Sequence, residues 1–175
     1  MRDSSTVGKR ATARGIALAT AKSVAERVRR LTGAAGVELE TKVAELWGGY
    51  GELWRGTLTQ GSETTSVIVK HVQPPPGEQG LSHRRKLRSY AVEQAFYERY
   101  AARCAESPSC RVPRPIKLQL EAGGWLFVLE DLDASGFSAR RTRAEPSEIR
   151  ATLRWLAAFH ARFLGTAPEQ LWKTG

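Results

Sequence analysis

Asparagine is absent from this chain of 175 residues, and cysteine occurs only as Cys104 and Cys110. Two cysteines are too few for a disulfide framework or a structural zinc site, so we expect reduced thiols in a cytoplasmic protein. No apolar run is long enough to span a bilayer, and no secretory signal with an apolar centre is present. An organelle transit peptide, which would also be rich in arginine and poor in acids, stays open for the N-terminal segment.

The net charge of +9 is unevenly distributed along the chain. Residues 1–33 contain eight Lys or Arg residues against Asp3 and Glu26, so this segment carries most of the excess. Its apolar residues recur at helical spacing, which predicts an amphipathic helix with a basic outer face: Ala17, Ala21, Val24, Val28 and Leu31. Because the charge is not interleaved with aromatics, nucleic acid is not an expected partner, and a basic nucleic-acid-binding protein is kept only as a second alternative.

Beyond the breaker Gly33–Gly36, the pattern changes to short runs typical of an α+β fold. Three antiparallel strands are expected over 37–72, and Pro74–Gly77 ends the last of them. We expect one long helix from Ser82 to about Cys104, then two strands and a final helix, over Ile116–Leu120, Trp125–Leu129 and from Glu145 to about Leu164. The fold class predicted is therefore a five-stranded antiparallel sheet with one long helix, plus N- and C-terminal helices.

Two features of this region suggest that it holds a phosphate. Gly48-Gly49-Tyr50-Gly51 forms a glycine-rich hairpin, and Val67-Ile68-Val69-Lys70 is a β-branched strand that ends in a cation. Glycines let backbone N–H groups approach a phosphate, and lysine neutralises its charge. A tight hairpin would use the same glycines without any ligand. Since the hairpin joins two strands, a Walker-type loop and a dinucleotide-binding turn are excluded, because both need a helix there.

The order of elements and motifs resembles the smaller lobe of the protein-kinase-like fold. Within it, the chain is similar to small-molecule kinases related to aminoglycoside phosphotransferases, choline kinases and ecdysteroid kinase-like proteins. The stretches that carry this resemblance, besides the glycine hairpin and the Lys70 strand, are Glu93-Gln94-Ala95-Phe96-Tyr97, Phe127-Val128-Leu129-Glu130-Asp131-Leu132 and Leu156-Ala157-Ala158-Phe159-His160. The domains expected are the basic helix over 1–33, the small lobe over 34–132, and a linker with the first larger-lobe helix over 133–175.

The resemblance implies an ATP site. Its residues would be the loop Gly48, Gly49, Tyr50 and Gly51, with Lys70 as the phosphate-binding lysine on the strand beneath that loop. Helical spacing favours Glu93 as the carboxylate that pairs with Lys70, with Glu98 as the competing partner. The carbonyl of Glu130 and the amide of Leu132 would contact adenine at a hinge, although two solvated acids at a strand end would look the same.

Residues that transfer the phosphate are missing from the expected pattern. The family's catalytic aspartate and its magnesium ligands lie in the larger lobe, whereas the aspartates here are Asp3, Asp131 and Asp133. We therefore expect no catalytic or metal-binding residue, and a truncated chain inactive alone, from a kinase of a small hydroxylated acceptor. A non-catalytic nucleotide-binding or regulatory module is the alternative. His160 is expected in the packed core face of the last helix, whose apolar surface would promote self-association.

Overall fold

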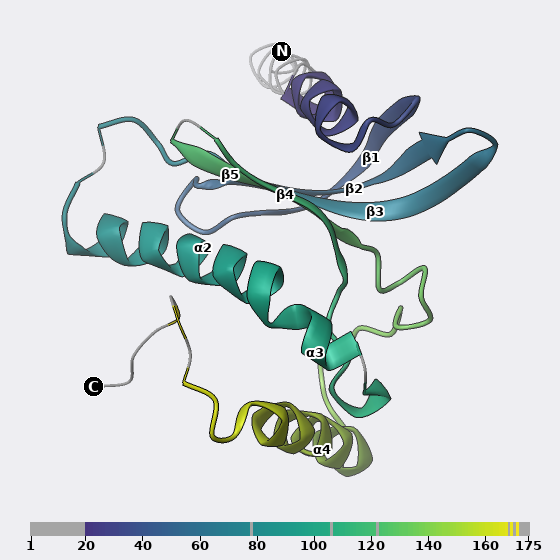
Figure 1. Cartoon of the computed structure of the whole chain (residues 1–175), viewed down its shortest axis with the longest axis vertical. Coiled ribbons are helices and arrows are strands. Elements are labelled where there is room, and N and C mark those ends of the chain that lie inside the picture. The colour runs from purple at the N-terminus through teal and green to yellow at the C-terminus, as the bar shows by residue number, and fades with distance from the viewer. Residues whose placement is uncertain are drawn as a thin grey trace, which may run out of the picture.

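The computed structural model describes residues 20–77, 79–105, 107–121 and 123–167, together with residues 169 and 171. A five-stranded antiparallel sheet in the order β1-β2-β3-β5-β4 lies at its centre (Figure 1). The strands are β1 (Gly36–Glu45), β2 (Gly51–Gln60), β3 (Glu63–Val72), β4 (Pro115–Glu121) and β5 (Gly124–Glu130). The α+β class and the antiparallel sheet predicted from the sequence are confirmed.

The middle of the sheet is its most buried part. β3 contributes the β-branched residues Val67 and Val69, neither of which is exposed to solvent. β5 pairs with β3 on one side and β4 on the other, and every residue from Gly124 to Leu129 is buried. Because both faces of β5 are covered, its sequence is an unbroken apolar run, without the polar alternation of a strand that has one wet face.

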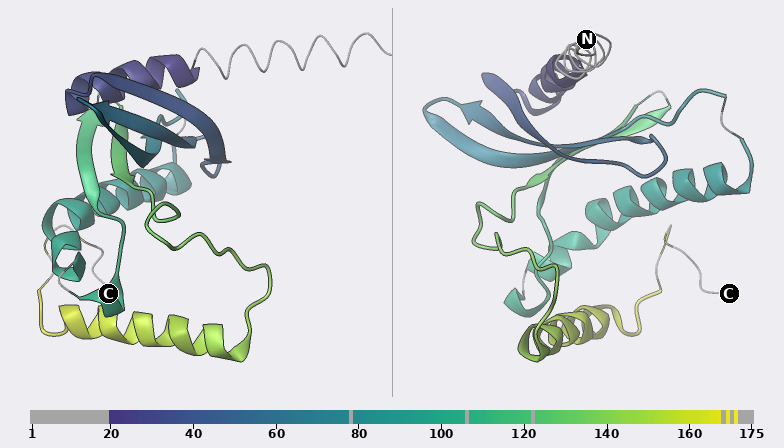
Figure 2. Two further views of the ribbon diagram at one scale, coloured as in Figure 1. Left: turned by 90° about the vertical axis from the view of Figure 1, so that its right-hand side faces the viewer. Right: turned by 180° about the vertical axis from the view of Figure 1, so that it is seen from behind.

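Helices cover both faces of the sheet (Figure 2). On one face lies the N-terminal helix, described over residues 20–32, whose Ala21, Val24 and Val28 pack against Trp54 and Val69. This matches the apolar stripe predicted there, apart from Ala17, which lies outside the described residues. On the other face α2 (Leu81–Arg99) packs against a cluster formed by Val72, Trp125, Phe127 and Leu129.

The long helix predicted over 82–104 is interrupted. α2 ends at Arg99, and after Tyr100 a short helix α3 (Ala101–Ala105) follows, with the 3-10 turn η1 (Pro108–Cys110) beyond it. No glycine or proline lies at this interruption of the helix, but Tyr100 at that position makes tertiary contacts. The Tyr100 hydroxyl bonds the backbone of Glu169, and its ring meets Phe163 at a centroid distance of 6.1 Å.

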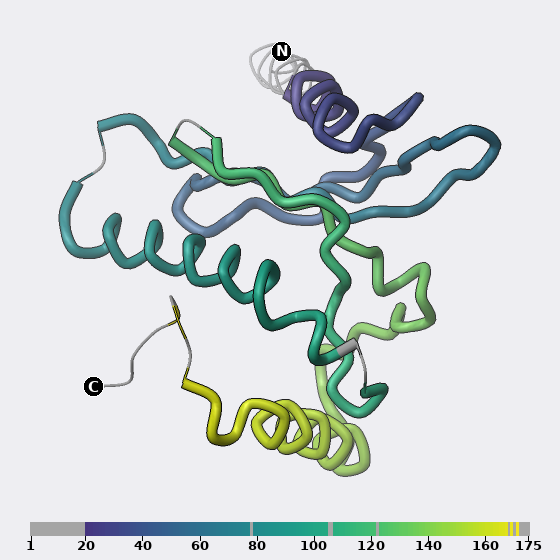
Figure 3. The backbone as a smooth tube through the Cα atoms, in the orientation of Figure 1, coloured from purple at the N-terminus to yellow at the C-terminus, as the bar shows by residue number. Residues whose placement is uncertain are grey.

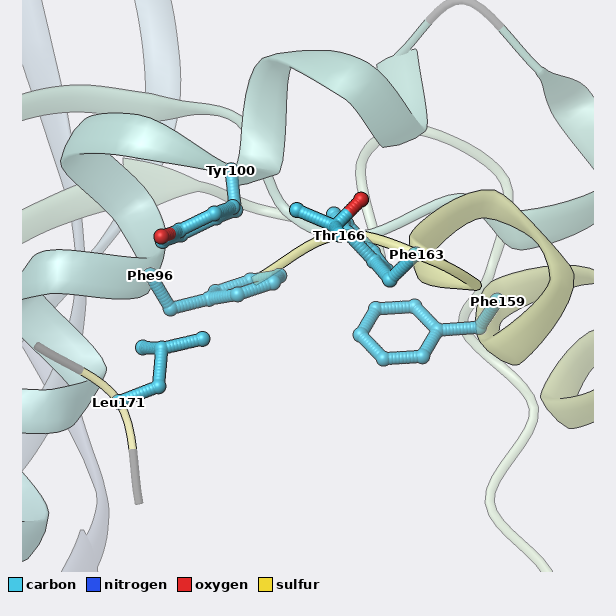
Figure 4. A pocket seen from close by; sticks show the side chains of 6 residues that line it. All are labelled: Phe96, Tyr100, Phe159, Phe163, Thr166 and Leu171. Atoms are coloured by element: carbon cyan, nitrogen blue, oxygen red, sulfur yellow. The ribbon is translucent and has the colours of Figure 1, made fainter. Parts of the chain in front are cut away.

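The last helix, α4 (Pro146–Phe163), lies away from the sheet and beyond α2, at the end of a long connection that Figure 3 traces. Its aromatic side packs against α2 around a small apolar cavity of about 190 Å³ (Figure 4), lined by Phe96, Tyr100, Phe159, Phe163, Thr166 and Leu171. The expectation for His160 is wrong, because this residue is exposed. Of the stripe that shares this face, Ile149, Leu153 and Leu156 are exposed, as expected of an apolar surface that would promote self-association, while Trp155 and Phe159 face the neighbouring elements.

Within the described ranges, none of the helices combines the length and the apolar character needed to cross a membrane.

Candidate functional site

The glycine turn between β1 and β2 is a tight hairpin in which three glycines have positive φ angles. Gly48 and Gly49 have φ of 73°, and Gly51 has φ of 132°. The Leu46 amide donates to the Gly51 carbonyl at 2.8 Å, which closes the turn. A Cβ on Gly51 would lie 2.0 Å from a carbonyl oxygen of β3, whereas a Cβ on Gly49 would meet nothing within 4 Å. Sheet packing therefore demands a glycine at 51, and the backbone at Gly49 is open to a ligand.

Lys70 lies on β3 and faces α2. Its Nζ donates to Oε2 of Glu93 at 2.5 Å, so the contact predicted from helix spacing is present. Glu98, the competing partner, instead accepts a hydrogen bond from Gln94. The ammonium also lies 5.1 Å from the ring centre of Tyr90, and the Lys70 side chain is only 17% exposed. Because aromatic rings and one carboxylate surround it, this cation is held in a defined position.

A hollow of about 740 Å³ lies between the glycine turn and α2. It is lined by Trp47, Lys70, Leu81, Ser82, Arg85, Lys86, Ser89, Tyr90 and Glu93. The structure thus brings Lys70 and Glu93 to one cavity next to the residue that begins the turn. Gly49 and Gly51 border a second hollow of about 300 Å³ on the face of the N-terminal helix, where Thr20, Glu45, Glu52, His71 and Gln73 complete the lining.

Tyr50, predicted as a nucleotide contact, has its ring buried beneath the turn. Its hydroxyl is 2.7 Å from Nδ1 of His83, and its ring stacks on that of Tyr90. Its carbonyl accepts from the Gln73 amide at 2.8 Å. Tyr50 therefore anchors the turn to α2, and its ring packs beneath the turn against Tyr90.

The predicted hinge residues lie at the end of β5, outside the linings of both hollows. The Glu130 carboxylate accepts from Arg111, from the Arg114 amide at 3.0 Å and from the Ser135 hydroxyl at 2.8 Å. The Leu132 carbonyl accepts from the Phe137 amide at 2.8 Å. These hydrogen bonds tie the hinge segment to the neighbouring loops.

One charged cluster beside the hinge was missed from the sequence. Asp131, 3% exposed, accepts from Arg55 of β2 at 2.8 Å and from Ser66 of β3 at 2.7 Å, and Arg55 also pairs with Asp133. Burial alone would raise the pKa of Asp131, but the hydrogen bonds from Ser66 and Arg55 outweigh it and lower that pKa. The available signal was Arg55 between apolar and small residues, Leu53-Trp54 before it and Gly56 after it.

His71 follows Lys70 on β3 and lies on the other face of the sheet, against the N-terminal helix, where it is 4% exposed. Its Nε2 is 2.9 Å from a guanidinium nitrogen of Arg27, which also pairs with Glu121. Burial, together with the smaller effect of the nearby Arg27 charge, lowers the pKa of His71 to about 4. A neutral ring that accepts a hydrogen bond from Arg27 therefore fastens this helix to the strand that bears Lys70.

No cluster suited to a metal ion is present among the described residues. Cys104 and Cys110 are both buried free thiols, and burial together with the neighbouring Cys110 raises the pKa of Cys104 to about 11. Such a protonated thiol is a poor nucleophile and a poor metal ligand, so Cys104 serves packing.

Comparison with known proteins identifies a family. The model of the ecdysteroid kinase-like family matches residues 52–169, well over half of the chain, and the matched range contains Lys70, Glu93 and the segment 130–132. No curated protein matches. The family resemblance seen in the sequence is thereby confirmed.

Proposed function

Because the chain belongs to the ecdysteroid kinase-like family, we propose that it forms the ATP-binding part of a phosphotransferase for a small hydroxylated substrate. Kinase-like phosphotransfer and the use of ATP are implied by the family. The assignment of the nucleotide to the hollow under the glycine turn is our inference, and the Lys70–Glu93 pair is the observation that carries it.

The chemistry of this pair suits a nucleotide phosphate. An ammonium has three N–H donors, and Glu93 occupies one of those of Lys70. Glu93 thus fixes the direction of the cation while leaving hydrogen-bonding capacity for an anionic ligand. Since both side chains are less than a third exposed, their electrostatic interaction with a phosphate is screened less than at the surface.

The adenine would contact the backbone at the hinge, as the family resemblance implies for Glu130 and Leu132. The engagement of the Glu130 carboxylate with Arg111 supports a role for main-chain groups only at this residue. A hinge held by internal hydrogen bonds presents its backbone in one geometry, which limits the entropy lost when a base binds.

The residues that the structure describes do not fit a catalytic magnesium site. Asparagine is absent, and both Asp131 and Asp133 are already paired with Arg55. Phosphoryl transfer relies on metal-assisted positioning and charge stabilisation, so we propose that these 175 residues bind ATP without transferring its phosphate. A regulatory nucleotide-binding module would have the same property.

Calorimetric titration with ATP, with and without Mg²⁺, tests the proposal. The chain should bind ATP, and Lys70→Met should weaken binding by about ten-fold or more, as loss of a charge-assisted hydrogen bond implies. Lys117→Met removes an exposed lysine of β4 outside the hollow and should leave binding unchanged. Absence of binding by the unmodified chain would refute the nucleotide site, and Mg²⁺-dependent turnover abolished by Lys70→Met would refute the proposed inactivity.

A further inference from the structure

The hollow under the glycine turn contains a second cation with no assigned task, Lys86 of α2. Its Nζ lies 4.2 Å from the ring centre of Tyr50 and 5.5 Å from that of Trp47. Among the described residues, no carboxylate forms an ion pair with it. A half-buried ammonium that rests on aromatic faces alone has unused donors and no neutralising partner.

The backbone of the glycine turn passes close to this ammonium. A Cβ on Gly48 would lie 2.5 Å from Nζ of Lys86, a separation that real Cβ atoms do not show. The left-handed φ of 73° at Gly48 also disfavours any other residue there. The φ of Gly48 therefore accounts for the glycine, and the Lys86 ammonium lies next to the backbone of the turn from the helix on the other side of the hollow.

Two elements thus bring lysines to one cavity. Lys70 comes from β3 and Lys86 from the first half of α2, and Arg85 adds a third cation to the lining. Among the described residues of the lining, Glu93 is the one acid, and it is paired with Lys70. The hollow therefore carries a surplus of positive charge, which attracts a multiply charged anion.

We propose that Lys86 is a second phosphate-binding residue, which contacts the di- or triphosphate tail of the nucleotide together with Lys70. Tyr50 acts as its platform, and the hydrogen bond between Tyr50 and His83 holds that platform in place. This inference rests on the proposed function, since it assumes that a nucleotide enters this hollow. It assigns recognition of the phosphate tail to α2 as well as to the strand.

Calorimetry with adenosine, ADP and ATP on the full 175-residue chain tests the proposal. Lys86→Met keeps the length and apolar stem of the side chain and removes its charge. It should weaken ADP and ATP binding by roughly ten-fold, as loss of a charge-assisted hydrogen bond implies, and leave adenosine binding unchanged. Lys117→Met is the matched control and should leave all three affinities unchanged.

The outcomes separate this inference from the proposed function. If Lys70→Met loses ATP binding while Lys86→Met retains it fully, Lys86 is only a brace for Tyr50, and the nucleotide site stands. If the unmodified chain binds none of the three ligands, both proposals fail. A Lys86→Met effect that is equally large for adenosine would also overturn the phosphate role.

A measurement on the unmodified chain covers the case in which Lys86→Met does not fold. Lysines are acetylated briefly with a soluble acetylating reagent, and the extent at each site is read by mass spectrometry. ATP should protect Lys86 more than adenosine does, with Lys117 equally modified in both. Equal modification of Lys86 in ATP and adenosine would overturn the proposal.

Discussion

Acidification should loosen the N-terminal helix from the sheet through His71. In the folded chain this ring is buried and faces the Arg27 guanidinium, and both burial and the Arg27 charge lower its pKa. The nearby Glu52 carboxylate partly opposes this lowering. Protonation would place two cations in contact beneath the helix. Folding therefore favours the neutral ring, and the folded chain takes up this proton at a lower pH than the unfolded chain does.

The pH window follows from the two pKa values. The ring titrates near 6.5 in the unfolded chain and at about 4 in the folded one. The stabilisation is thus complete above pH 6.5 and is lost progressively as the pH falls towards 4. From pH 7 to pH 5 the linkage relation gives a loss of about 1–2 kcal/mol in the free energy of unfolding, after allowance for solvent screening.

Urea unfolding followed by circular dichroism at pH 7 and pH 5 measures this loss. Carboxylates elsewhere also titrate on acidification, so the informative quantity is the difference between the wild-type chain and His71→Gln. The variant keeps an acceptor for Arg27 but has no titrating ring, and its stability should fall less. An identical pH dependence in both chains would refute the reasoning, as would a His71 ring that titrates near 6.5 by NMR.

Three further predictions concern stability and association. Arg55→Met should lower the free energy of unfolding by about 2 kcal/mol in chemical denaturation, because it leaves the buried Asp131 carboxylate without its cation; a change under 0.5 kcal/mol would contradict this. Gly51→Ala should lower the melting temperature far more than Gly49→Ala, since only the first places a Cβ 2.0 Å from a β3 carbonyl, and equal losses would show that φ alone matters. The exposed stripe of α4 should make the chain self-associate, so the mass measured by light scattering should rise with protein concentration. Leu153→Glu should keep that mass at the monomer value. A wild-type chain that stays monomeric at all concentrations would contradict the predicted self-association.

Much of the fold was predictable because its signals are local. The β-branched run Val67–Val69 and the turn glycines locate the meander, and the structure confirms its strands to within a few residues. The Lys70–Glu93 contact was also accessible from the sequence, because alternation on a strand and spacing on a helix place each side chain on a definite face. The strands depend on residues that are near in sequence, and the Lys70–Glu93 contact depends only on the packing of one helix against one strand.

The missed features depend on contacts between distant segments. Arg55 and Asp131 are 76 positions apart and meet because β2 and the end of β5 flank β3. The approach of Lys86 to Gly48 likewise depends on where α2 crosses beneath the turn. Neither spacing nor composition gives that crossing position.

By itself the sequence determined the order of the elements, the family and the pair of charges on which the nucleotide hypothesis depends. Periodicity states which residues share a face of an element, because backbone geometry sets it locally. The tertiary structure alone decided which face is covered, as α4 demonstrates. Its stripe through Leu153 and His160 has helical spacing typical of a core, yet Phe159 and Trp155 make the contacts. The face that becomes core is the one for which the rest of the chain supplies a complementary surface, and that surface exists only once the chain is folded.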